Sequence, residues 1–302
     1  MYRLLTSFWS AIFFISPTLV HAQTVIPHWA SQIYNGSTDM VLGGSSLATD
    51  KEGNIYALVM AGLGGYMNAD GIQTTNSDVT MALVSWNCDH SFRWMRAMGG
   101  SATHSGLQLK IDTLGGIYIS GRTLSNSGPG NAYWDADTTL NIPANSFVEY
   151  LVKYDTSGQF QWLRTPASYM GLPSTTAYLS VTPSGQAYWF SLLEPGNYNG
   201  GTINISTRKY YALHYDASGT YISLTPFDMT PPTTGSLAPR SMFVFDHSTN
   251  RFYACLVYQP TYGPLTIGTT NIVASSTANP RTSVLAAFNS QGSSLWARQG
   301  DI

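Results

Sequence analysis

The chain has 302 residues, enough for one large repeat domain or two domains of ordinary size. Charged residues make up only 10% of it and aromatic residues 13%, and the formal net charge is −2. This charge predicts no basic surface for nucleic acid, and an apolar fraction of 43% argues against a disordered chain. We therefore expect a folded protein with a surface rich in Ser, Thr, Asn and Gly.

Residues 1–22 have the pattern of a secretory signal peptide. Arg3 supplies the positive charge, an apolar run extends from Leu4 to Val20, and a small-x-small cleavage sequence ends at Ala22. We expect a mature chain without a membrane span, located outside the cell or on the outer cell surface. The alternative is an uncleaved membrane anchor, which is less favourable because Pro17 interrupts a short apolar run.

Residues 23–44 follow, and the stretch from Ile26 to Tyr34 is predicted to form a single strand. Its Trp29 precedes Trp94 by about 65 residues, the interval at which later tryptophans also recur. The other strands of such a unit are missing before it. We interpret this segment as a candidate closing strand for a ring of repeats.

Residues 45–302 carry a four-fold internal repeat with a period of about 65 residues. The copies cover approximately residues 45–100, 105–167, 176–228 and 240–300. Each has a tyrosine shortly after a turn, and all but the third have a tryptophan near the end, where the third has Ser223. The repeat residues are Tyr56, Tyr118, Tyr188 and Tyr253 on one track and Trp29, Trp94, Trp162 and Trp296 on the other.

Each copy is predicted to form four short strands, as the second copy illustrates. Its first strand ends at Asp112, and a turn with Gly115 leads into the second strand. A long polar loop precedes the third strand, and an Asp-x-x-Gly turn at residues 155–158 leads to the fourth. This order is typical of a propeller blade. The sequence therefore predicts an all-β fold, a β-propeller built of four-stranded antiparallel blades.

The chain has five strands of the tryptophan type but only four sets of the other three strands. We therefore expect it to be a fragment of a larger propeller, with further blades after the fourth. An open arc is favoured over a closed ring of four blades. The third copy is expected to pack less tightly because Ser223 replaces its tryptophan.

Three copies have an arginine two residues after the tryptophan, at Arg96, Arg164 and Arg298. Residues two apart on a strand share a face. One interpretation is a basic binding row. The favoured one is an arginine that stacks beside the tryptophan or bonds to the neighbouring blade.

The repeats resemble the bacterial secreted β-propeller repeat family of the SBBP type. The likeness lies in the segment from Asp50 to Tyr56 and in the segment from Lys153 to Trp162, and it extends over nearly the whole mature chain. His90 departs from the pattern by replacing a turn glycine. The resemblance implies an exported protein, a substrate of type nine secretion, and says little about activity.

No constellation of catalytic residues is found among the six histidines and 16 acids. Zinc, phosphate-loop and nucleophile-elbow motifs are absent from the sequence, so no catalytic residue, metal or cofactor is predicted. The segment from Asp135 to Asp137 has the spacing of a calcium-loop fragment, but ordinary turn chemistry is favoured. Asp50, Asp112 and Asp246 recur with the repeat and are interpreted as structural.

Two further residue types carry predictions. Cys88 and Cys255 are interpreted as free, small apolar residues, with a disulfide as the alternative. Thr138 lies in an Asp-Thr-Thr sequence that resembles an O-glycosylation acceptor of some bacteria.

The leading functional hypothesis is a non-catalytic binding or scaffold module, because long polar loops on a rigid scaffold are common binding surfaces. Its partner would be an extracellular protein or a glycan. The alternative is a carbohydrate-active propeller, either a lectin or a glycoside hydrolase. That alternative rests on aromatic residues in the loops, which could instead simply pack there: Tyr66, Tyr133, Trp134, Tyr198 and Tyr262.

Overall fold

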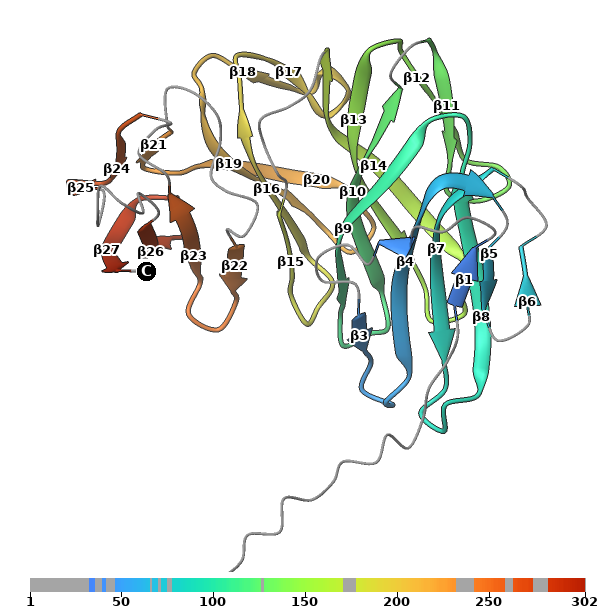
Figure 1. Ribbon diagram of the computed structural model, residues 1–302. Helices are drawn as coiled ribbons and strands as arrows, with labels where there is room; N and C mark the ends of the chain where they lie inside the picture. The colour runs from blue at the N-terminus through green and yellow to red at the C-terminus, as the bar shows by residue number, and fades with distance from the viewer. Residues whose placement is uncertain are drawn as a thin grey trace, which may run out of the picture. The chain divides into compact units, whose positions relative to one another are not determined.

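The computed structural model describes only part of the chain (Figure 1). The described ranges are 33–35, 40–41, 47–65, 67–69, 72–74, 78–125, 128–170, 178–231, 242–258, 263–273 and 282–301. The predicted signal peptide, the strand around Trp29, and the loop residues Tyr66 and Tyr262 lie outside them. Within these ranges the elements are β-strands and one short 3-10 helix. The described residues contain no helix that is long and apolar enough to cross a membrane. The all-β prediction is confirmed.

Four antiparallel sheets follow one another along the chain (Figure 1). We call them sheets I to IV. Sheets II, III and IV each have four strands. In each of these sheets the two central strands are the second and third of its own four strands in chain order. Sheet II is formed by β9 (Thr103–Ile111), β10 (Ile117–Ser125), β13 (Ser146–Tyr154) and β14 (Phe160–Met170). Sheet III is formed by β15 (Tyr178–Val181), β16 (Ala187–Leu193), β19 (Lys209–Tyr215) and β20 (Tyr221–Pro226). Sheet IV is formed by β22 (Met242–Asp246), β23 (Arg251–Tyr258), β26 (Thr282–Asn289) and β27 (Ser294–Asp301).

Sheet I has the same four-strand core within a seven-stranded sheet. The core strands are β3 (Leu47–Thr49), β4 (Ile55–Gly65), β7 (Val79–Trp86) and β8 (Phe92–Gly99), and β2 (Met40–Val41), β11 (Gly130–Tyr133) and β12 (Thr139–Ile142) extend it. A closed propeller is not detected among the described residues. The arrangement of the sheets as propeller blades remains a prediction.

Short strands form within the predicted long loops, where no strands were expected from the sequence. Besides the β11–β12 pair they form β5 (Met67–Ala69) with β6 (Ile72–Gln73), β17 (Gly196–Tyr198) with β18 (Ile203–Ile205), and β24 (Leu265–Ile267) with β25 (Thr270–Ile272). The remaining elements are β1 (Ile33–Asn35), which pairs with β5, β21 (Met229–Thr230), which pairs with β24, and the 3-10 helix η1 (Asn199–Gly201). Alternating apolar residues such as Ile203 and Ile205 are buried and hold these pairs on the sheets.

The repeat residues occupy one position in each sheet. Tyr118 lies opposite Lys153, which lies opposite Trp162, and the register of sheets I and IV places their tyrosine and tryptophan in the same way. In sheet III the corresponding row runs from Tyr188 to Ser223. Each sheet also has a register shift next to this row, between its third and fourth strands. The sequence repeat is therefore a repeat of strand register.

Successive sheets bury apolar faces against each other. One core joins Leu58 and Leu83 of sheet I to Ile119 and Val152 of sheet II. A second core joins sheets II and III, and a third, rich in phenylalanine, joins sheets III and IV. As a result, β16 is buried along its whole length, on both faces. The residues of β7 are also all buried, and one of its faces lies in the core shared by sheets I and II.

Candidate functional site

The tryptophan and arginine of one sheet bind the main chain of the next. Trp94 Nε1 donates to the carbonyl oxygen of Thr156 at 3.0 Å, and Arg96 Nε donates to that of Gly158 at 2.7 Å. The Arg96 guanidinium also lies 5.8 Å from the centre of the Trp94 ring. For Arg96 these contacts confirm the interpretation of an arginine that lies beside the tryptophan and bonds to the neighbouring sheet.

The same arrangement recurs between sheets II and III. Trp162 Nε1 donates to the carbonyl oxygen of Ala217 at 3.2 Å, and Arg164 Nε donates to that of Gly219 at 2.6 Å. Gly219 has φ of +79°, and a Cβ there would lie 2.7 Å from the Trp162 ring. The turn glycine is required both by its backbone conformation and by the close approach of the ring.

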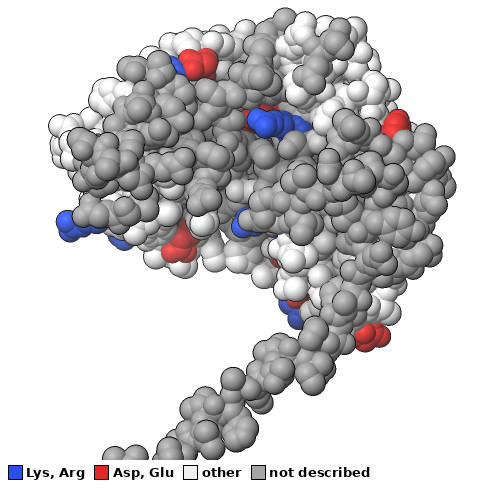
Figure 2. All heavy atoms as spheres, viewed as in Figure 1, with Lys and Arg blue, Asp and Glu red and all other residues white. Residues whose placement is uncertain are grey.

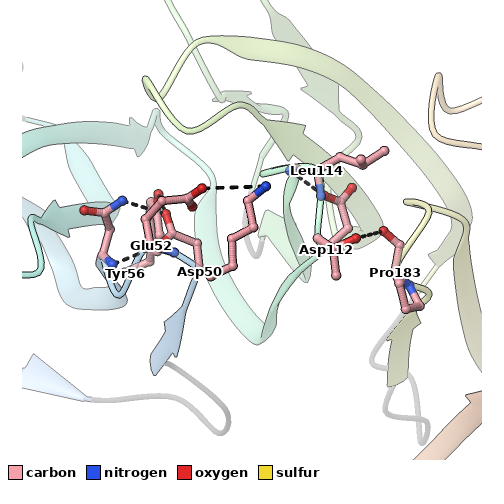
Figure 3. A network of polar contacts seen from close by, with 10 residues as sticks. Asp50, Glu52, Tyr56, Asp112, Leu114 and Pro183 are labelled. Carbon is pink, nitrogen blue, oxygen red and sulfur yellow. Dashed lines mark hydrogen bonds and ion pairs between the residues drawn. The ribbon is translucent and has the colours of Figure 1, made fainter.

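Tyr118 forms a second link between sheets II and III. The Tyr118 hydroxyl lies 3.0 Å from Asp112 Oδ2 and 2.8 Å from the carbonyl oxygen of Gly185 in sheet III. Burial and the neighbouring Asp112 carboxylate raise the pKa of Tyr118 well above its usual range, so its hydroxyl keeps its proton. Thr113 Oγ1 donates to the carbonyl oxygen of Pro183 at 2.7 Å (Figure 3). The acids Asp50 and Asp112 order their own turns by accepting backbone amides (Figure 3), as their structural interpretation expects.

Sheets III and IV are joined differently. Tyr188 stacks on His214 at 4.2 Å and meets Phe245 of sheet IV, also at 4.2 Å between ring centres. The Asp228 amide donates to the carbonyl oxygen of Gly292 at 2.8 Å. Where Ser223 replaces the tryptophan, the aromatic contact to Tyr188 therefore comes from the following sheet, and this core contains many packed rings.

A groove of about 900 Å³ lies where strands β8 and β14 and the β11–β12 turn meet. Its volume is in the range of small-molecule and oligomeric ligand sites. Aromatic side chains dominate its lining: Phe92, Trp94, Tyr133, Trp134, Tyr154 and Phe160. The groove is thus walled by sheets I and II, whose contacts fix its shape.

Two threonines line the groove, Thr74 and Thr139, and its longer polar or charged side chains are Arg96, Asp135 and Gln159. Arg96 is held by the turn of sheet II, and Asp135 Oδ1 accepts the amides of Asp137 at 3.0 Å and Thr138 at 2.6 Å. This is turn chemistry rather than a cation loop. The exposed amide of Gln159 lies at the rim and is available to a ligand.

The loop aromatics predicted from the sequence have different environments. Tyr133 is half-buried, and its hydroxyl donates to Asp78 Oδ1 at 2.9 Å. Trp134 is 1% exposed and packs edge-on against Tyr150 at 5.1 Å, so it forms the floor of the groove. Tyr198 is buried and donates to the carbonyl oxygen of Glu194, away from the groove. The structure brings together two of the predicted residues, Tyr133 and Trp134.

Phe92 and Phe160 also line the groove, and they are not among the site residues predicted from the sequence. Each stands two residues before a repeat tryptophan, Trp94 or Trp162. Positions two apart share a face of a strand, and this spacing is the signal that could have identified them.

Glu149 and His104 are buried titratable side chains that do not line the groove. Glu149 is 0% exposed, and neither of its carboxylate oxygens has a hydrogen-bond partner in the part of the chain that the structure describes. Burial raises its pKa to about 8, although Arg122 on the neighbouring strand opposes the rise. Burial lowers the pKa of His104 to about 4. These groups are separate from the groove, and no cluster of three or more His, Cys, Asp or Glu suited to a metal occurs in the described ranges.

The structure also describes the predicted glycosylation residue and the two cysteines. Thr138 is half-buried in the β11–β12 turn, and Cys88 and Cys255 are free, Cys88 being exposed. The described acidic and basic side chains are scattered over the face shown in Figure 2. No known family and no curated protein matches the chain. The resemblance to SBBP-type repeats therefore remains a prediction.

Proposed function

We propose that the protein is a secreted or cell-surface β-propeller of four-stranded blades that acts as a non-catalytic binding module. The observation that carries the proposal is the aromatic groove between sheets I and II. Its walls are held by contacts to main-chain atoms, so the site is formed before a ligand arrives. A preformed, mostly apolar groove with a few polar groups at its rim is typical of a binding site.

The distribution of acids supports binding over catalysis. Among the described lining residues Asp135 is the one carboxylate, and its oxygen Oδ1 accepts hydrogen bonds from backbone amides. Glycoside hydrolysis ordinarily uses two carboxyl groups about 5–10 Å apart. The groove supports a ligand-binding role better than a hydrolytic one.

Carbohydrate is the ligand class that the lining favours as a second, more specific function. Sugar rings present apolar C–H faces that pack on aromatic rings, and their hydroxyls pair with groups such as the Gln159 amide. This favours a lectin-like protein over a hydrolase. An extracellular protein with an exposed aromatic loop is the alternative ligand.

A blocking variant tests the site. Ala136 is exposed at the groove, so Ala136→Trp fills it without changing the core. We expect at least about a tenfold loss of binding on a glycan array or to intact cells, equivalent to about 1.4 kcal/mol. Ser206→Trp, at an exposed position outside the groove, is the matched control and leaves binding unchanged. Equal binding by the blocked variant refutes the groove, and hydrolysis that Asp135→Asn abolishes refutes the non-catalytic role.

A further inference from the structure

Sheet IV exposes the face that the other sheets bury. Trp296 is 41% exposed, whereas Trp162 is 7% exposed, and Leu285 is 52% exposed, whereas Leu151 is 0% exposed. Along β23, buried residues alternate with half-exposed ones, while β7 and β16 are buried throughout. We call this surface the end face; it consists of Met242, Val244, Tyr253, Cys255, Leu285 and Trp296, which line a hollow of about 260 Å³.

The end face carries the binding groups of the inter-sheet links. Trp296 lies opposite Ala287 and Arg298 opposite Leu285, as Trp162 lies opposite Lys153 and Arg164 opposite Leu151. Tyr253 lies in the row of Trp296, as Tyr118 lies in that of Trp162. In sheets I and II these donors bind carbonyl oxygens of the next sheet's turn. The same donors in sheet IV are exposed.

The partner of the end face can be inferred by asking whether sheet I could receive it. The side of sheet I that would receive such a face carries Ala57, Val59, Ala82 and Val84, all already buried at 0–4% exposure. Neither sheet I of the same chain nor sheet I of a second copy therefore offers a free acceptor face.

The two observed acceptor turns begin with acids, Asp155 and Asp216. Hydrogen bonds from Ser218 and Thr220 lower the pKa of Asp216, and the charge of Arg164 lowers it further.

We propose that the end face binds a further β-sheet of this same repeat type, one that carries an Asp-x-Ser-Gly turn. Trp296 Nε1 and Arg298 Nε donate to main-chain carbonyl oxygens of that turn, and the turn carboxylate lies near the Arg298 guanidinium. Tyr253, Cys255 and Leu285 pack against its apolar side chains. The interaction continues the interface between sheets I and II and is independent of the groove.

Thiol chemistry on the full chain tests the proposal, because Cys255 lies in the end face and Cys88 is exposed elsewhere. The probe is a backbone-cyclised peptide with the sequence of residues 146–170, which includes β13, the turn at 155–158 and β14. At saturation we expect alkylation of Cys255 to slow by at least about tenfold, with Cys88 unchanged. Trp296→Ala and Arg298→Ala, both at exposed positions, abolish this protection; Leu114→Ala, at an exposed turn, retains it.

Three outcomes overturn the proposal. The first is no protection of Cys255 by millimolar peptide whose strand pairing has been verified by NMR, since an isolated hairpin is only marginally stable. The second is equal protection by a peptide of the same composition in scrambled order. The third is protection that grows with the concentration of the chain alone, since that would make a second copy the occupant.

Discussion

Replacing Glu149 by Gln should remove a large pH dependence of stability. The carboxyl is fully buried in the structure, with a pKa of about 8, against 4.5 in the unfolded chain. A group whose pKa is raised on folding stabilises the folded state below its unfolded pKa, and this contribution is lost as the pH rises through the folded value. Ionisation of Glu149 therefore lowers the free energy of unfolding by about 4 kcal/mol between pH 4.5 and 8.

His104 has the opposite effect on the pH dependence of the free energy of unfolding over part of this pH range. Its pKa falls from 6.5 to about 4 on folding, so the unfolded chain binds a proton more readily. Its contribution to stability is present above pH 6.5 and is lost as the pH falls towards 4. The two groups largely cancel between pH 4.5 and 6.5, and the wild-type chain should lose stability mainly between pH 6.5 and 8.

Comparison of Glu149→Gln with the wild type isolates the carboxyl, because His104 is common to both chains. Urea unfolding is measured for both chains at intervals of half a pH unit from pH 4.5 to 8. The free energy of unfolding of the variant relative to the wild type should rise by about 4 kcal/mol over this range. Glu52→Gln, which removes a carboxyl at an exposed turn position, is the control for the loss of a surface carboxyl. A constant difference for Glu149→Gln would refute the buried, neutral carboxyl.

Three further changes probe the links between the sheets. Trp162→Ala should lower the free energy of unfolding by about 3–5 kcal/mol, whereas Trp296→Ala, at an exposed position, should cost less than about 1 kcal/mol; equal urea midpoints for the two variants would contradict the packing described. Ser223→Trp should not stabilise the chain, because Tyr188 is already packed by Phe245 and overpacking costs about 1–3 kcal/mol; a raised melting temperature is the contrary result. Gly219→Ala should destabilise more than Gly200→Ala, since both have positive φ but only the first brings a Cβ against Trp162; calorimetry of both variants compares them.

The strands and turns were predictable from local patterns. Tyr118 and Trp162 mark a strand register that recurs with the repeat, and the turn glycines, such as Gly158, are fixed by positive φ. The short pairs inside the loops were not predicted, because strands of three residues around Asn and Gly resemble ordinary turns. Burial of Ile203 and Ile205 decides their structure, and burial depends on the rest of the sheet.

The groove was only partly predictable for a related reason. Phe92 and Phe160 come from strands about 70 residues apart, and they converge because sheets I and II stack. The sequence identified Tyr133 and Trp134 as aromatic loop residues. It contained no signal that Trp134 is buried at the floor of the groove, since that position depends on contacts with Tyr150.

The donors of the inter-sheet links are specific side chains, but the acceptors are main-chain oxygens. The acceptor of Trp94 is at Thr156 and the acceptor of Trp162 is at Ala217, two unlike residues in equivalent turns. A carbonyl oxygen offers the same hydrogen bond whatever side chain follows it. The residue whose carbonyl oxygen accepts the tryptophan can therefore differ from unit to unit, provided that the turn keeps its glycine, and a duplicated unit can accept its neighbour without a compensating mutation at that residue.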